Sequence, residues 1–140
     1  MGENLRTYFD AENRALQALK KMKDKEFIFS GYAIQQFVRT AKHPSPQISE
    51  LDHSEKIDLI VVLKHQTSGD VLTGVLQIKS QRRNFDNFLK EKRPVWCLLV
   101  MKHHSLTYVE RMLSKFFKMI IQNRRNNRRF TRANIPLHLL

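Results

Sequence analysis

Short apolar runs separated by polar, turn-forming residues dominate the middle of the chain. The run 57–63 (IDLIVVL) is rich in β-branched residues and predicts a buried strand, and so does the run 71–79 (VLTGVLQIK). Between them, residues 65–70 carry a Ser-Gly pair with polar neighbours, which is typical of a turn. The two runs therefore predict one β-hairpin.

Helical periodicity flanks this hairpin. Residues 3–25 and 107–120 place apolar side chains three and four positions apart, which predicts two amphipathic helices. The run 95–101 is continuously apolar and predicts a central strand, whereas residues 26–32 predict an additional edge strand whose place in the sheet stays open. Together these elements predict an α/β domain of 140 residues with a mixed sheet flanked by helices.

Two local signals refine the element boundaries. Thr107 and Glu110 have the spacing of a capping box, which marks the start of the last helix. The segment from His43 to Lys56 contains two prolines and no clear periodicity, so we expect a long loop there.

Polar side chains interrupt the apolar hairpin at one place. Because side chains alternate along a strand, Gln77 and Lys79 lie on the same face. A turn centred on residues 67–68 sets Asp58 opposite Gln77, and a turn centred on residues 68–69 sets it opposite Lys79. In both registers a carboxylate, an amide and an ammonium group lie together on an otherwise apolar surface, which indicates a functional site.

Oxygen ligands of this kind suit a hard divalent ion such as Mg²⁺, with Mn²⁺ as its substitute, because Mg²⁺ takes few protein oxygens and keeps several waters. The candidate ligands are Asp58, the side-chain carbonyl of Gln77 and the backbone carbonyl of Ile78. Lys79 would then face water at the metal, where it could help to form hydroxide or stabilise charge in a transition state. Glu12 falls within the apolar stripe of the first helix, which favours an additional metal or water ligand; a salt bridge or a helix-end position is the alternative.

The order Glu12, Asp58, Gln77-x-Lys79 resembles the PD-(D/E)XK, or restriction-endonuclease-like, nuclease superfamily. The Gln-x-Lys spelling is similar to that of Mrr-type restriction nucleases, and the glutamate on a preceding helix is similar to that of archaeal Holliday-junction resolvases. The resemblance implies an α-β-β-β-α core and Mg²⁺-dependent cleavage of DNA. Most members have an acid where this chain has Gln77, and this departure leaves open a non-catalytic descendant that only binds nucleic acid.

Charge is distributed very unevenly along the chain. Residues 1–78 contain ten Lys or Arg and ten Asp or Glu, so the entire net charge of +12 lies beyond residue 78. A basic field of this size attracts polyanions, and we expect Arg82, Arg83 and four arginines of the C-terminal segment to contact phosphates. The four are Arg124, Arg125, Arg128 and Arg129, in a basic C-terminal segment at about 121–140.

Composition adds the remaining limits. The one cysteine, Cys97, lies within an apolar run and predicts core packing, and no Cys/His set has zinc spacing. No apolar stretch is long enough for a membrane span and the N-terminus lacks a signal-peptide pattern, so we expect an intracellular protein without membrane contact.

The sequence therefore predicts a metal-dependent endonuclease that hydrolyses DNA phosphodiesters, of a restriction, junction-resolving, repair or homing type. Cutting both strands would require a homodimer or higher symmetric assembly, because a chain of this size presents one active site. Two alternatives remain, namely a nucleic-acid-binding module that retains the fold and a basic interaction or ribosome-associated factor.

Overall fold

The computed structural model describes residues 9–123, 130–132 and 134–140. It contains a five-stranded sheet with strand order β1-β2-β3-β4-β5. The strands are β1 (Ile28–Phe29), β2 (Tyr32–Arg39), β3 (Leu59–His65), β4 (Val71–Lys79) and β5 (Trp96–Leu99). The helices are α2 (Ala11–Asp24), α3 (Pro46–Ser54), α4 (Arg82–Lys90), α5 (Leu106–Gln122) and the 3₁₀ turn η1 (Leu137–Leu139).

The sheet is mixed. Strands β1 to β4 form an antiparallel meander, and β5 then pairs parallel with β4. A parallel neighbour needs a crossover connection, which α4 provides. The C-terminal segment continues the line of β5 along β4, because Val75 N–H donates to Phe130 O and Arg132 N–H donates to Thr73 O.

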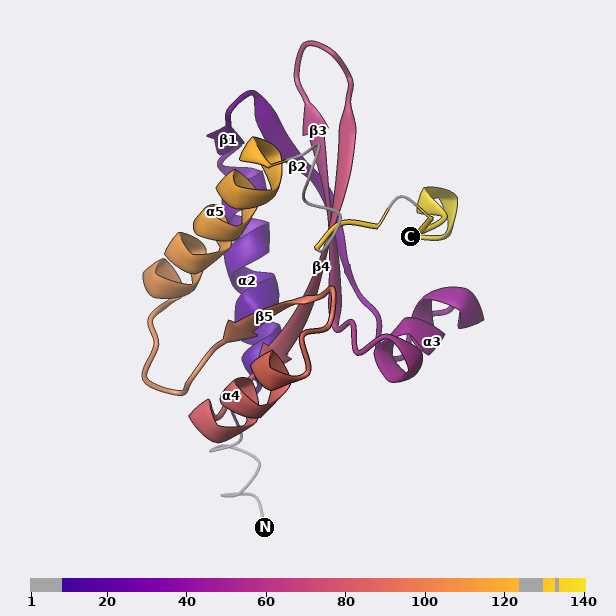
Figure 1. The fold of residues 1–140 in the computed structure, drawn as a ribbon. Helices are drawn as coiled ribbons and strands as arrows, with labels where there is room; N and C mark the ends of the chain where they lie inside the picture. Colours follow the sequence, from indigo (N-terminus) through magenta and orange to yellow (C-terminus); the bar gives the residue numbers. More distant parts are fainter. Residues whose placement is uncertain (1–8, 124–129, 133) are drawn as a thin grey trace.

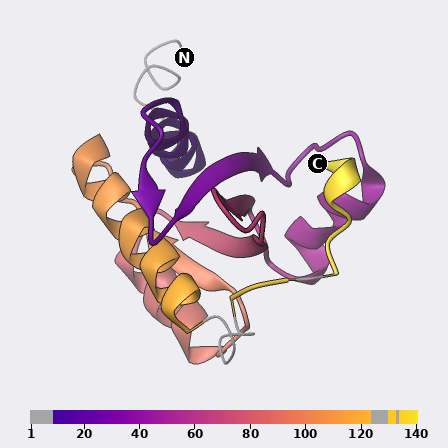
Figure 2. The same cartoon turned by 90° about the horizontal axis from the view of Figure 1, so that it is seen from above.

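Helices cover both faces of the sheet. Figures 1 and 2 show α2 and α5 side by side on one face, with α3 and the C-terminal segment on the other. The main core lies under α2 and α5, where Leu19, Phe116 and Phe117 are fully buried. Gly74 of β4 permits close packing of α5, because a Cβ atom there would lie 2.9 Å from the Phe116 ring. A smaller core on the opposite face joins α3, α4 and the C-terminal segment.

The hairpin prediction is confirmed for its second strand and its turn. Strand β4 has the predicted bounds, and Leu59 pairs with Leu76, which corresponds to a turn centred on residues 67–68. The paired register ends at Leu59, and Asp58 N–H donates to Leu76 O, so the predicted pairing of Asp58 with Gln77 is not part of the sheet. The first strand, however, begins at Leu59 and ends at His65, so its predicted start at Ile57 was wrong.

Several other sequence predictions were wrong. The run 95–101 is shorter, as β5, and it is the last strand of the sheet rather than a central one. Its continuous apolar character arises because α4, α5 and the neighbouring segments cover it. The expected long loop contains α3, and β2 was not predicted. The edge-strand prediction for residues 26–32 is confirmed by the two-residue β1, which is the first strand in the sheet order.

The helix boundaries also required correction. Helix α2 begins at Ala11 with Asp10 as its N-cap, so Phe9 and Asp10 are not helical; residues 3–8 of the predicted helix lie outside the described part. Helix α5 is capped by Ser105, whose hydroxyl accepts from Tyr108 N–H at 3.1 Å, rather than by Thr107. Glu110 instead pairs with Lys21 of α2 at 3.1 Å.

Candidate functional site

The backbone departs from regular strand geometry at Asp58. Its C=O accepts from Thr40 N–H of the segment after β2, whereas its N–H donates to Leu76 O of β4. In a regular strand both groups of one residue point to the same neighbour, so the chain turns here, at the point where β3 meets the end of β4. The Thr40 hydroxyl stabilises the turn by donating to Ile57 O at 2.6 Å.

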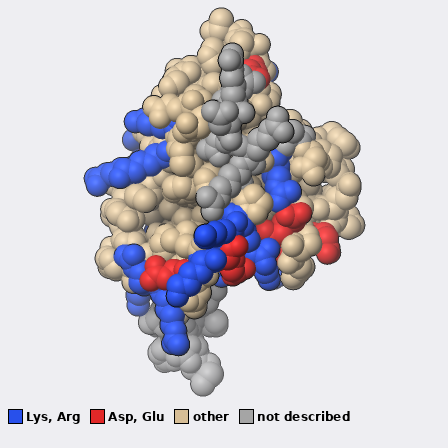
Figure 3. All heavy atoms as spheres, viewed as in Figure 1, with Lys and Arg blue, Asp and Glu red and all other residues tan. Residues whose placement is uncertain are grey.

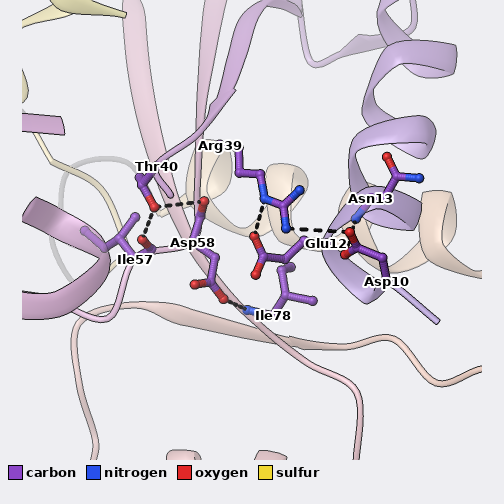
Figure 4. Close-up of polar contacts among 8 residues, drawn as sticks. All are labelled: Asp10, Glu12, Asn13, Arg39, Thr40, Ile57, Asp58 and Ile78. Atoms are coloured by element: carbon purple, nitrogen blue, oxygen red, sulfur yellow. Dashed lines mark hydrogen bonds and ion pairs between the residues drawn. The ribbon is translucent and has the colours of Figure 1, made fainter. Parts of the chain in front are cut away.

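The Asp58 side chain takes the place of a backbone partner (Figure 4). Its Oδ2 accepts a hydrogen bond from Ile78 N–H at 2.7 Å. Since the N–H and C=O of a strand residue point to the same side, the Ile78 carbonyl is also directed to the Asp58 side of β4. The carboxylate and this carbonyl thus lie on the same side of one strand, as the predicted metal site requires.

Asp58 lies in an unfavourable setting for a negative charge. The side chain is 6% exposed, and burial raises the pKa of its carboxyl to about 7. The hydrogen bond from Ile78 N–H opposes this shift, while the carboxyls of Asp52 and Glu12 add to it. Either a proton or a cation is therefore needed to compensate Asp58 near neutral pH.

Gln77 lies on β4 one residue before Ile78, the residue that binds the Asp58 carboxylate. Gln77 pairs with Cys97 of the parallel strand β5, and paired residues share a face of the sheet. Gln77 is 8% exposed, and its Oε1 is buried without a hydrogen-bond partner in the described part of the protein. Because a buried polar atom without a partner costs about 1–3 kcal/mol, this oxygen is a candidate metal ligand.

Lys79 lies on the same face as Gln77. Its Nζ is 5.7 Å from the centre of the Phe88 ring, beneath α4. The Cys97 thiol responds to both charged groups: burial raises its pKa to about 12, with Lys79 lowering it and Asp58 raising it. Gln77 thus lies beside Cys97, and Cys97 is itself buried as the sequence predicted.

Glu12 lies in the first turn of α2, where it is half-buried, and an ion pair holds it (Figure 4). Its Oε1 accepts from Arg39 Nε at 2.8 Å, and Arg39 Nη2 lies 3.6 Å from Asp10 Oδ2. Burial by itself would lower the pKa of Arg39, but Glu12 and Asp10 raise it overall. Glu12 therefore forms the salt bridge that the sequence analysis gave as the alternative. Its negative charge also helps to raise the pKa of Asp58.

The predicted phosphate-binding residues fall into two groups. Arg82 and Arg83 are exposed at the start of α4, three and four positions after Lys79. Figure 3 shows Lys and Arg side chains around α4, interspersed with acids, and along the α5 side of the molecule. The second predicted group, Arg124, Arg125, Arg128 and Arg129, lies outside the described residues.

Sequence analysis missed two residues that shape the site. Asp52 was assigned to a loop but lies on α3, where its carboxyl raises the pKa of Asp58. The pair Ser45-Pro46 was the available signal, since a serine N-cap followed by proline is a common helix start. Arg39 was not connected to Glu12 because nothing local links positions 27 residues apart.

Comparisons with known proteins do not assign the chain to a family. No protein-family model matches it, and no curated protein or solved structure is significantly similar. Within the described residues, no group of three or more His, Cys, Asp or Glu side chains could hold a metal ion. The predicted ligand set differs from such a group, because it combines one carboxylate with a side-chain amide oxygen and a main-chain carbonyl. No described helix is both long and apolar enough to cross a membrane.

Proposed function

We propose that this protein is a Mg²⁺-dependent endonuclease that hydrolyses phosphodiester bonds of DNA. The observation that carries the proposal is the buried, unpartnered Oε1 of Gln77 one residue before Ile78, whose N–H donates to the buried carboxylate of Asp58. A second oxygen donor next to the residue that binds a buried acid, where the acid forms no described ion pair, suits a hard cation.

The arrangement of elements supports the same proposal. A helix with Glu12, an antiparallel meander with Asp58 and Gln77-x-Lys79 on its last two segments, and a helix leading to a parallel strand follow in this order. With α5 after the last strand, and with β1, β2 and α3 as additions before β3, the chain contains the α-β-β-β-α order that the resemblance to the PD-(D/E)XK superfamily implies. The basic half of the chain begins at Lys79, so the strongest attraction for a polyanion starts at the proposed site.

The residues fit a divalent cation in donor chemistry. Asp58, the Gln77 amide oxygen and the Ile78 carbonyl are hard oxygen donors, and Mg²⁺ commonly uses only one or two carboxylates. When bound, the ion supplies Lewis-acid polarisation of the phosphate and lowers the pKa of water. Lys79 would orient the attacking water and stabilise negative charge, and Glu12 would assist once released from Arg39. Arg82 and Arg83 would hold the strand by its phosphates.

A second function is favoured by one specific observation. Arg39 forms ion pairs with both Glu12 and Asp10. The guanidinium group of Arg39 therefore balances the charge of two acids near the site, as a metal ion could. A nucleic-acid-binding module that has lost catalysis would keep such a pair in place of a metal. In that case the fold and the basic surface serve binding alone.

The deciding experiment is cleavage of plasmid and branched DNA in Mg²⁺ or Mn²⁺. The nuclease proposal expects cutting by the wild type, and loss of cutting with retained DNA binding in Asp58→Asn and Lys79→Met. Lys64→Met is the matched control, because Lys64 is an exposed lysine on the neighbouring strand. We expect this variant to cut as the wild type does. Tight DNA binding without cutting in either metal would establish the binding module instead. Mass measurement with and without DNA would test the symmetric assembly that double-strand cutting requires.

A further inference from the structure

A cavity of about 290 Å³ lies between α4 and the edge of the sheet at β5. Four aromatic residues and two cationic residues line it. The aromatic residues are Phe85, Phe88, Trp96 and Phe130, and the cationic ones are Lys92 and Arg93. Ordinary core packing would close such a volume, so an open aromatic cavity indicates a binding site.

The aromatic walls are held in place by their own contacts. Trp96 stacks on Phe116 of α5, with ring centres 5.5 Å apart, and meets Phe130 edge to face at 5.4 Å. The Nε1 atom of Trp96 is buried and has no hydrogen-bond partner among the described residues. On the other wall, Phe85 is half-buried and Phe88 is 5% exposed. The cavity is therefore preformed by rigid rings, which reduces the entropic cost of binding a flat ligand.

Charge and position connect this cavity to the proposed site. The Lys79 ammonium lies over the Phe88 ring, 5.7 Å from the ring centre. Cys97 also lines the cavity, and it pairs with Gln77 in the sheet. Lys92 is exposed at the cavity, and Arg93 is half-buried beside it, paired with Glu91 at 2.7 Å. A ligand that is aromatic in one part and anionic in the next fits this combination.

We propose that the cavity binds one unpaired nucleobase of the nucleic-acid strand engaged by the proposed site. Its volume lies at the low end of small-ligand pockets, about 300–1,000 Å³, and so suits one base rather than a longer stack. Aromatic rings bind bases of any sequence by stacking, and Lys92 and Arg93 contact the adjoining phosphates. This inference rests on the proposed function and deepens it, since it makes the substrate a strand with unpaired nucleotides, such as a flap, a junction or a single strand.

Trp96 provides the assay, because it is the only tryptophan in the chain. Stacking of a base in the cavity quenches its fluorescence, so we would titrate the protein with a short oligothymidylate in EDTA. An abasic strand of equal length and charge is the control ligand. We expect quenching by oligothymidylate and at least about fivefold weaker binding of the abasic strand, since stacking on aromatic side chains contributes about 1–3 kcal/mol per base.

Two matched variants locate the effect. Phe85→Leu keeps an apolar side chain but removes one aromatic wall, and should weaken oligothymidylate binding about fivefold or more without changing abasic-strand binding. Phe37→Leu makes the same change at a half-buried position on the opposite face of the sheet, and should leave both affinities unaltered.

The outcomes separate this inference from the nuclease proposal. Quenching in EDTA without cleavage in Mg²⁺ would support the base pocket and refute the nuclease proposal. Cleavage in Mg²⁺ with equal binding of oligothymidylate and the abasic strand would support the nuclease proposal and refute the base pocket. Equal quenching by thymidine monophosphate alone would show that the site takes free nucleotides rather than a strand. Quenching only by an acidic, phenylalanine-containing peptide would assign the cavity to a protein partner and overturn the inference.

Discussion

Asp58→Asn is expected to remove a large part of the pH dependence of the protein's stability. In the folded protein, burial raises the pKa of the Asp58 carboxyl from its ordinary value of 3.8 to about 7. The folded state therefore holds this proton more tightly than the unfolded state does. The stabilisation is fully present below pH 3.8 and is lost as the pH rises through about 7.

The magnitude follows from the size of the shift. Each pKa unit corresponds to about 1.36 kcal/mol, so the full effect is roughly 4 kcal/mol. Of this, about 2.5 kcal/mol is expected between pH 5 and pH 8, where the folded carboxyl loses its proton. Asparagine has nearly the same shape and keeps an oxygen that can accept from Ile78 N–H, so the variant removes titration with little change in packing.

The measurement is urea unfolding followed by Trp96 fluorescence at several pH values. Other groups titrate in the same range, so the informative quantity is the difference in unfolding free energy between wild type and Asp58→Asn. We expect that difference to change by about 2.5 kcal/mol between pH 5 and pH 8, with the wild type losing stability relative to the variant. Asp86→Asn, at an exposed position on α4, controls for the same substitution at the surface.

Parallel stability curves for wild type and Asp58→Asn would refute the reasoning, because they would show that Asp58 titrates alike in both states. Asp52→Asn gives an independent check. Since Asp52 adds to the raised pKa of Asp58, its removal should move the wild-type transition to lower pH without abolishing it.

Three other variants test the site and its support. Gln77→Glu provides the second carboxylate, and Mn²⁺ binding by calorimetry should become about tenfold tighter; unchanged affinity would remove Gln77 from the ligand set. Arg39→Gln removes the cation beside Glu12 and should tighten Mn²⁺ binding about three- to tenfold, whereas weaker binding would show that Arg39 supports the site. Gly74→Ala places a methyl group against the buried Phe116 ring and should lower the unfolding free energy by about 1–3 kcal/mol, measured in urea; a neutral result would show that α5 can move away from β4.

The hairpin could be predicted because its information is local. Strand β4 is a nearly continuous buried run, and the turn residues fix its register with β3. The start of β3 could not be predicted, since side chains replace ladder hydrogen bonds there. The Thr40 hydroxyl takes Ile57 O, and the Asp58 carboxylate takes Ile78 N–H, so an apolar-looking run contains residues outside the strand.

Strand β2 and helix α3 were not predicted from the sequence, for two different physical reasons. The alternation of β2 is broken by a register shift between Ile34 and Gln36, which obscures the period of two. In α3 only Ile48 is buried, so the helix has almost no apolar stripe to detect. Both elements are made stable by tertiary packing against β3 and the smaller core, which periodicity in a short window does not report.

The sequence indicated that Asp58 meets the end of β4, but not how it does so or what its charge state is. Asp58 binds Ile78 N–H through its carboxylate, and its raised pKa depends on burial and on Asp52, which comes from a helix that was not predicted. Arg39 forms its close ion pairs with Glu12 and Asp10 and acts on Asp58 only at longer range, so no described ion pair includes Asp58. A proton below pH 7 and a divalent cation above it would satisfy the same carboxylate, and only the cation would also give Gln77 Oε1 a partner. Proton and metal are therefore expected to compete for this position, which links the pH dependence of stability directly to the proposed catalytic function.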